Sequence, residues 1–213
     1  MIKLEKIEVM NIEGAIRGMR NPLESWDNSD SGYVTGDNEF TTYFAIGPND
    51  WKLALKLVKA GSDHRKFMRQ IFVSMDITAP TYWWTHYATY KISTVENSTS
   101  KMHKAGTRYF KMSDFGWDYI TSFREACLKH YNWLIDKRNS ALKHDLHTEA
   151  DKWWRELIQD LPDSYLYLRT VSLNYENLRN MYHARNKHKL PEWHEFCQMI
   201  KTLPYSELIT IKK

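Results

Sequence analysis

The stretch APTYWWTHYATYKISTVENSTSKMHK, Ala79 to Lys104, gathers aromatic, hydroxyl and cationic side chains in one place. Within 26 residues it holds two adjacent tryptophans, three tyrosines, three lysines, many serines and threonines, and a single acid. Hydroxyl and ammonium groups donate hydrogen bonds to phosphate oxygens, aromatic rings stack on flat ring systems, and nearby carboxylates would oppose an anion. The composition therefore suits a nucleotide or a flavin as ligand.

The same stretch has a plainer interpretation, because aromatic clusters are mostly core and hydroxyl-rich segments are often surface turns. Adjacent helical positions point about 100° apart, so Trp83 and Trp84 cannot serve one apolar face equally. We expect one of the two to be free to face a ligand or another subunit.

The chain of 213 residues is long enough for a single domain, 1–213, with a real core. The alternating residues of its N-terminus predict a strand and not a signal peptide, and no segment approaches the roughly 18 to 20 apolar residues of a membrane span. We therefore expect a cytoplasmic protein without a membrane partner. A net charge of +4, concentrated in 64–111 and 179–189, does not require nucleic acid and suits a small phosphorylated ligand.

The cysteines and histidines give no sign of a metal site. Cys127 and Cys197 lie in apolar helical patterns without CxxC spacing, which predicts reduced core thiols. The histidine pairs 183/188 and 144/147 have no HExxH motif or cysteine partner, so we expect no bound metal.

The first half of the chain predicts both strands and helices. Alternating residues indicate a strand over 3–18, with Gly14 and Gly18 as places for a bulge or bend, and 20–40 is expected to be a long loop. A helix capped by Asn49 or Asp50 should end at Gly61 and bury Trp51, Leu55 and Val58. A strand over 70–77 and a helix over 80–90 follow.

The second half is mainly helical. An amphipathic helix is expected from about Ile120 to Lys143, with Phe123 and Leu134 on its buried face, and another from Thr148, with Asp151 in its capping box, to the residue before Leu161. An extended segment over 164–174, helices over 177–190 and 191–204, and a tail complete the chain.

A second basic cluster lies on the expected helix 177–190 and comprises Arg179, Arg185, Lys187, His188 and Lys189. Its plainer interpretation is a solvated charged face. Met181 and Tyr182 belong to a buried stripe of this helix, so Arg185, four and three residues later, should lie at the edge of the buried side. No GxGxxG, GxxxxGK[ST] or GxSxG motif is present, so in an enzyme we expect a bound cofactor to supply the chemistry.

The order of these pieces resembles the flavin-dependent thymidylate synthases. Their signature leads from Ala-Pro through a helix into Arg-His-Arg, then Ser, Asn-Glu, Ser and Arg-Tyr, and APTYWWTHYATYKISTVENSTSKM aligns with it without a gap. KLALKLVKAGSDHRKFMRQIFVSMDITAP and LPDSYLYLRTVSLNYENLRNMYHARNKHKLPEWHEF resemble the flanking segments, so the resemblance covers about residues 50 to 200. It implies an α+β fold with a small, mostly antiparallel sheet packed with several helices, and a homotetramer with sites between subunits.

Carried over by position, the resemblance implies contacts to the substrate at Lys91, Thr99, Lys101 and Arg185, and contacts to the cofactor at Ile92, Thr94, Asn97, Asn174, Asn180 and His188. Lys91 stands for the second arginine of Arg-His-Arg, and Lys101 for the arginine that grips the uracil nucleotide. The implied reaction methylates dUMP to dTMP with FAD, NADPH and methylenetetrahydrofolate. Family enzymes use no protein nucleophile, so no catalytic residue is named.

The departures from the signature leave three functions open. Thr89 and Tyr90 replace the first arginine and the histidine, Glu96-Asn97 reverses the Asn-Glu order, and lysine lacks the two-pronged grip of a guanidinium. The chain is then an active synthase, a homologue that binds a nucleotide or flavin but has lost or changed the reaction, or a non-catalytic oligomeric protein whose aromatic stretch is an interface.

Overall fold

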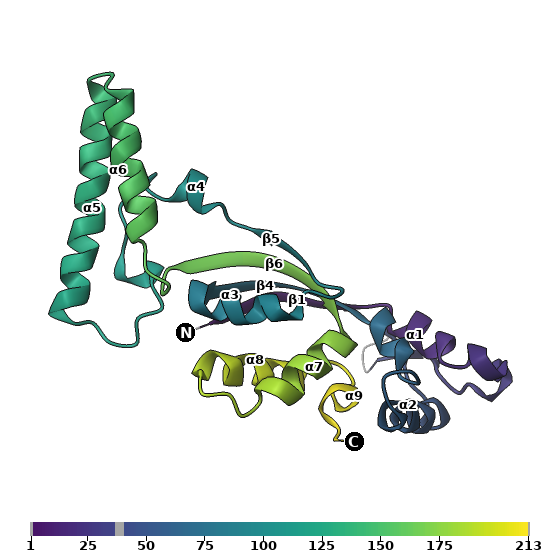
Figure 1. Ribbon diagram of the computed structural model, residues 1–213. Helices are drawn as coiled ribbons and strands as arrows, with labels where there is room; N and C mark the ends of the chain where they lie inside the picture. The colour runs from purple at the N-terminus through teal and green to yellow at the C-terminus, as the bar shows by residue number, and fades with distance from the viewer. Residues whose placement is uncertain (1, 37–40, 213) are drawn as a thin grey trace. The chain divides into compact units, whose positions relative to one another are not determined.

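The computed structural model describes residues 2–36 and 41–212 and divides the chain into two compact units (Figure 1). The first unit comprises the described residues of 1–3, 77–89 and 97–170, and the second unit those of 4–76, 90–96 and 171–213. Strands β4 (Phe72–Pro80) and β6 (Leu166–Asn174) each contribute residues to both units.

The main sheet has four strands in the order β1-β4-β6-β5, where β1 is Lys3–Met10 and β5 is Val95–Ser98. In β4, alternate side chains are buried, namely Val73, Met75, Ile77 and Ala79, as the two-residue period of a strand requires. The strand predicted over 70–77 is confirmed, and it continues to Pro80, which is the N-cap of α3 (Thr81–Tyr87). A small antiparallel sheet combined with helices confirms the α+β class.

The predicted N-terminal strand over 3–18 is wrong beyond Met10. Asn11 adopts a left-handed conformation with φ 64°, which asparagine tolerates better than most residues, and α1 (Ile12–Gly18) begins directly after it. Ala15 and Ile16 are buried on this helix. Gly14 is therefore a helix residue and not a bulge, at a place where a Cβ would collide with the Asn11 side chain.

The loop expected over 20–40 contains ordered structure. Two short 3-10 helices, η1 (Asn21–Leu23) and η2 (Trp26–Asn28), precede β2 (Gly32–Thr35), which pairs antiparallel with β3 (Thr42–Ala45). The prediction is wrong for these segments, because a strand of four residues without alternating burial gives no local periodic signal. Its part over 37–40 lies outside the described residues.

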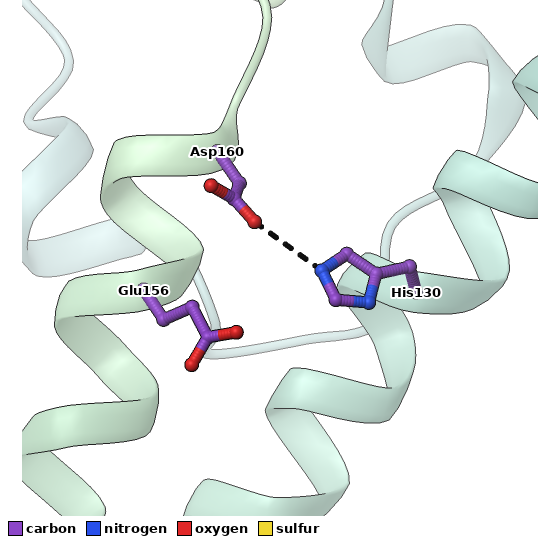
Figure 2. Close-up of side chains that lie close together, drawn as sticks. All are labelled: His130, Glu156 and Asp160. Atoms are coloured by element: carbon purple, nitrogen blue, oxygen red, sulfur yellow. Dashed lines mark hydrogen bonds and ion pairs between the residues drawn. The ribbon is translucent and has the colours of Figure 1, made fainter.

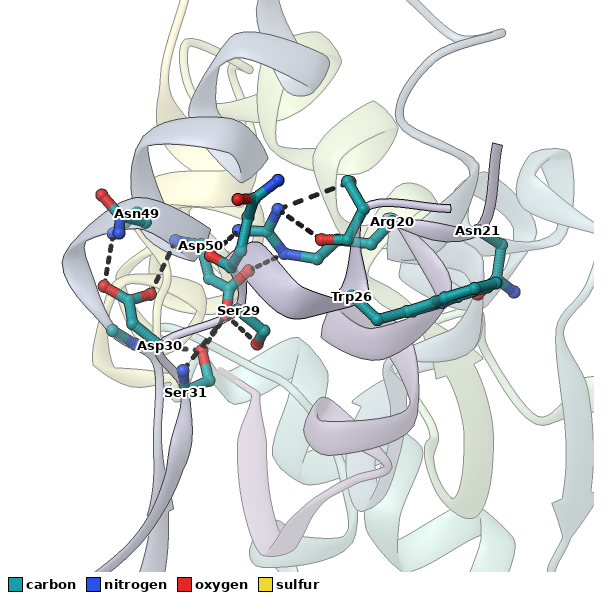
Figure 3. Close-up of polar contacts among 11 residues, drawn as sticks. Arg20, Asn21, Trp26, Ser29, Asp30, Ser31, Asn49 and Asp50 are labelled. Atoms are coloured by element: carbon teal, nitrogen blue, oxygen red, sulfur yellow. Dashed lines mark hydrogen bonds and ion pairs between the residues drawn. The ribbon is translucent and has the colours of Figure 1, made fainter. Parts of the chain in front are cut away.

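A buried polar network connects this segment to α2 (Pro48–Ala60), as Figure 3 shows. The Arg20 guanidinium donates from Nε to Asp50 Oδ1 at 2.6 Å, and the Ser29 and Ser31 hydroxyls donate to Asp50 Oδ2 at 2.6 and 2.5 Å. Burial raises the pKa of the Asp50 carboxyl, but the hydrogen bonds from the two serines and Arg20 outweigh it and hold that pKa below its usual value.

The N-terminus of α2 is capped from a distance. We expected Asn49 or Asp50 to be the cap, but neither side chain caps the helix, which begins at Pro48. Instead the Asp30 carboxylate accepts hydrogen bonds from the backbone N–H groups of both residues, at 2.8 and 3.1 Å (Figure 3). The predicted end at Gly61 is confirmed, and there φ is +119°. Of the predicted buried face, Val58 is buried, whereas Trp51 and Leu55 are half-buried.

In the first unit, α5 (Ser122–Lys143) and α6 (His147–Asp160) lie side by side (Figure 1). Both predicted helices are confirmed, and their core includes Phe110, Phe115, Tyr131, Leu134 and Leu157. Two details are wrong. Ile120 and Phe123 are 62% and 75% exposed instead of buried, and α6 begins at His147 after Leu146, without the predicted side-chain cap by Thr148.

In the second unit, α7 (Tyr175–Arg185) and α8 (Pro191–Thr202) confirm the two helices predicted near the C-terminus. The expected tail is wrong, because α9 (Glu207–Thr210) follows and buries Leu208 and Ile209. Cys127 and Cys197 are free thiols, half-buried and buried respectively. Across residues 2–36 and 41–212, no helix combines the length and the apolar character needed to cross a membrane.

Candidate functional site

Both tryptophans of the aromatic stretch are core residues. Trp83 and Trp84 are 0% and 1% exposed, and their rings meet edge to face with centroids 5.0 Å apart. The Trp84 indole donates to the Tyr167 carbonyl at 3.3 Å, and the Arg169 guanidinium lies 4.4 Å from its ring centroid. The expectation that one tryptophan is free to face a ligand is therefore wrong, because β6 covers Trp84 with a carbonyl and a cation.

A cation held against aromatic rings lies in the second unit, and we call it the Tyr90 cluster: Tyr90, Arg185, His188 and Trp193. The Arg185 guanidinium lies 5.6 Å from the centroid of the Tyr90 ring and 5.2 Å from that of Trp193. Its Nε donates to the Tyr90 hydroxyl at 2.9 Å, and the His188 ring meets Trp193 at 6.5 Å. Arg185 is half-buried, which confirms its predicted place at the edge of the buried side.

The Tyr90 cluster is suited to hold a flat or anionic group. The Arg185 guanidinium contacts both rings and donates to the Tyr90 hydroxyl, and within the described part of the chain no residue accepts from its two terminal amino groups. A guanidinium placed in this way can grip a phosphate, or two oxygens of a ring, with parallel hydrogen bonds. Sequence reasoning found Arg185 and His188 but not Trp193, and noted Tyr90 only as a departure from the signature.

The predicted hydroxyl donors are already engaged with the backbone. Thr94 Oγ1 donates to the Tyr90 carbonyl at 3.0 Å, and Thr99 Oγ1 donates to the Leu168 carbonyl at 3.3 Å. The Ile92 carbonyl, predicted to contact the flavin, accepts from Asn177 Nδ2 at 2.7 Å. The side chains of Lys91, Ile92 and Asn97 are exposed, so they are accessible to a ligand.

Lys101 begins α4 (Lys101–Lys104) in the first unit and is half-buried. Burial lowers the pKa of its ammonium group, and the nearby charge of Asp163 partly offsets that effect. The Ser100 hydroxyl accepts from the backbone N–H of His103 and caps this short helix.

The predicted cofactor residues on α7 lie in different environments. Asn174 is buried and caps the helix, where its Oδ1 accepts from the Asn177 N–H at 3.0 Å and its own N–H donates to Asn177 Oδ1 at 3.2 Å. Asn180 is exposed and lines a cavity. His188 Nδ1 accepts from the Leu190 N–H at 3.1 Å. Ligand contacts of these residues stay predictions.

One group of metal-ligating side chains is found among the described residues, and Figure 2 shows its members, His130 on α5 and Glu156 and Asp160 on α6. Their ligand atoms all lie within 4.8 Å of one another, and His130 Nε2 is 3.3 Å from Asp160 Oδ2. Glu156 and Asp160 are exposed and His130 is half-buried, so a solvated pairing of the histidine with the acids accounts for the closeness.

Comparison with known proteins shows the fold. The sequence matches no family model and no curated protein. Among solved structures, Thymidylate Synthase X (ThyX) from Helicobacter pylori with FAD and dUMP superposes with a TM-score of 0.66 at 13% identity, over 100% of this chain and 98% of that one. The UMP/dUMP methylase PolB from Streptomyces cacaoi bound with 5-Br UMP gives a TM-score of 0.56 at 12% identity, over 95% and 88%. The chain therefore has the ThyX-like fold, which the sequence resemblance implied from about residues 50 to 200.

Proposed function

We propose that this chain is a divergent flavin-dependent thymidylate synthase that binds a uracil nucleotide and FAD and methylates dUMP to dTMP. NADPH and methylenetetrahydrofolate would be its co-substrates, and a homotetramer its working form. Two proteins of the same fold support the ligand class, because ThyX was solved with FAD and dUMP and PolB with 5-Br UMP. The observation that carries the proposal is Arg185, a cation in contact with the Tyr90 and Trp193 rings at a position that the resemblance assigns to the substrate.

Each proposed contact can be judged from the present partners of its side chain. Arg185 offers two amino groups to the phosphate or uracil oxygens, and Lys91, in the same unit, adds positive charge without a two-pronged grip. Lys101 belongs to the first unit, and its contact rests on the resemblance alone. Thr94 and Thr99 donate to backbone carbonyls, so each binds a phosphate oxygen only after its hydroxyl turns away. The cationic and aromatic groups thus fit a flat phosphorylated ligand, whereas the hydroxyl groups need a local rearrangement.

In this proposal FAD supplies, when bound, the redox chemistry of the methylation. The chain itself would hold the nucleotide and orient its ring, and by the resemblance none of its side chains acts as a nucleophile in this reaction. Asn174 contributes by fixing the N-terminus of α7, the helix on which Arg185 lies, because its side chain closes the capping box.

The second candidate keeps the nucleotide and changes the reaction. Tyr90 stands where the signature has histidine, and its hydroxyl accepts the Arg185 Nε–H that would otherwise be open to a ligand. A uracil nucleotide would then contact a tyrosine in place of the histidine, and an arginine whose Nε–H already donates to that tyrosine. Binding of UMP or dUMP without turnover to dTMP would identify this homologue.

Calorimetric titration of dUMP against Arg185 variants tests the proposed binding role. Arg185→Met removes at least one charge-assisted hydrogen bond worth about 1.5 to 3 kcal/mol, so we expect dUMP affinity to fall by at least roughly 10- to 150-fold. Arg185→Lys keeps the charge but loses the planar pair of donors, and should recover only part of the affinity. Lys189→Met, an exposed neighbour, is the matched control and should change affinity less than about twofold. Equal dUMP affinity in wild type and Arg185→Met would remove Arg185 from the site.

A further inference from the structure

The second unit contains a cavity of about 600 Å³ with a strongly basic lining. Its lining side chains include Arg65, Arg179, Asn180, His183, Lys187 and Lys212, and no acid is among the described residues that line it. This volume lies in the range of small-ligand pockets, about 300 to 1,000 Å³. The cavity therefore has room for more than a single ion.

Arg65 holds an unused hydrogen-bond donor at this cavity. The side chain is only 8% exposed, and its Nε and Nη2 donate to Glu176 Oε2 and Oε1 at 2.7 and 2.9 Å. That two-pronged pair uses one edge of the guanidinium, and Nη1 lies outside it, buried and without an acceptor in the described residues. A buried unpaired donor is costly, and most such groups have a partner in the working protein.

Arg179 adds a second buried cation next to the first. It is buried, and its Nη1 donates to the carbonyls of Leu208 and Ile209 at 3.2 and 2.9 Å. Burial lowers the pKa of the Arg179 guanidinium, the Arg65 charge lowers it further, and Glu176 opposes both. Burial likewise lowers the pKa of His183, with help from the Arg179 charge.

Lysines extend the positive charge around the cavity. Lys187 and Lys212 line it and are exposed, so their ammonium groups can move toward a ligand. Glu176 pairs with Arg65, and this one carboxylate cannot balance two arginines and two lysines. An anion would reduce the repulsion between these cations, and it would accept from Arg65 Nη1 only after the buried guanidinium turns toward the cavity.

We propose that this cavity binds the phosphate or diphosphate group of a small ligand. Two or more negative charges match the excess of cations, and phosphate oxygens accept from guanidinium, ammonium and amide donors together. The Asn180 amide is one such donor. The inference goes beyond the nucleotide contact of Arg185, because it rests on the charge of a cavity that none of Tyr90, Arg185 and Trp193 lines. Asn180 is the lining residue that the resemblance also assigns to the cofactor, and to that extent the inference rests on the proposed function.

Titration with inorganic pyrophosphate at fixed ionic strength tests this site in the intact chain. We expect saturable binding at one site per chain by calorimetry, with a shift of the His183 side-chain NMR signals. In Lys187→Gln/Lys212→Gln, affinity should fall about five- to twentyfold, because each exposed ion pair is worth up to about 1 kcal/mol. These exposed lysines can be changed without disturbing the core, which thermal unfolding of the variant checks.

The matched control is Lys52→Gln/Lys56→Gln, which removes two exposed lysines of α2 that do not line the cavity. Its pyrophosphate affinity should stay within about twofold of wild type. Absence of saturable binding at millimolar pyrophosphate, or an equal loss in both double variants, would overturn the proposal.

Competition identifies the source of the phosphate. If pyrophosphate displaces FAD, the cavity holds the diphosphate of the cofactor, and if both bind together it serves a separate phosphorylated ligand. Both results support a phosphate site. A chain that binds pyrophosphate but no FAD would refute the proposed synthase function and leave this inference intact.

Discussion

The substitution Asp50→Asn tests whether the polar network of Figure 3 holds the segment before α2 in place. The Asp50 side chain is fully buried, and that of its ion-pair partner Arg20 is only 6% exposed. Asparagine has nearly the same shape, but it leaves the Arg20 charge without its partner. It also presents an amide group where the carboxylate accepts from Ser29 and Ser31.

Breaking a buried ion pair by removing one partner costs about 3 to 5 kcal/mol, and we expect this loss in the free energy of unfolding of Asp50→Asn. Urea unfolding at pH 7, followed by circular dichroism, measures it. Asp30→Asn is the matched control, because Asp30 is exposed and acts as a helix cap, and asparagine still caps helices about as well as aspartate does. Its loss should stay below the roughly 2 kcal/mol that removal of a cap side chain costs at most. A cost below about 1 kcal/mol for Asp50→Asn would refute the reasoning.

The stability difference between wild type and Asp50→Asn should depend on pH. The folded-state pKa of Asp50 lies below the value of about 3.9 in an unfolded chain, so its carboxylate contributes stability above that pH and loses it as the pH falls through the folded value. The difference in unfolding free energy between wild type and Asp50→Asn should be constant from pH 7 to about pH 5. It should shrink below about pH 4, and a difference that grows on acidification would contradict the assigned sign.

Three further predictions concern the core. Trp83→Ala should lower the free energy of unfolding by about 3 to 5 kcal/mol in urea, whereas Trp26→Ala, at a half-exposed ring, should cost far less; similar costs would contradict the burial of Trp83. Burial raises the pKa of Tyr131 to about 12, so the folded chain keeps a proton that the unfolded chain loses near pH 10. Wild type should therefore lose stability relative to Tyr131→Phe between about pH 10 and 12, as measured by urea unfolding. Burial also raises the pKa of the Cys197 thiol to about 11, so a thiol reagent at pH 8 should label Cys127 quickly and Cys197 slowly, and two equal rates by mass spectrometry would refute this.

The local sequence pattern was sufficient to predict a helix or strand where the buried residues of that element are regularly spaced along it. The spacing of apolar residues predicts α5 and α8. The strand predicted over 70–77 is part of β4, in which Val73 and Met75 are alternate buried residues. The position of Arg185 at the edge of a buried face also follows from its spacing to Met181 and Tyr182. These features depend on neighbours within one or two turns.

The features that sequence reasoning missed depend on distant partners. The N-terminus of α2 is capped by Asp30, which lies 19 residues before Asn49, so the usual search for a cap at the helix start fails. Trp84 is buried by a carbonyl 83 residues later, and Arg185 contacts a hydroxyl 95 residues earlier. Such pairings leave no trace in a local window, which is why Tyr90 and Trp193 were not predicted as partners of Arg185.

The measurement that tests the central claim most directly is the visible absorption spectrum of the purified chain with added FAD, followed by titration with dUMP. The proposed function predicts a protein-bound flavin spectrum that shifts with dUMP, and a much weaker shift in Arg185→Met. A chain that binds no flavin under any condition would contradict the proposal and leave a ThyX-like fold used for another purpose.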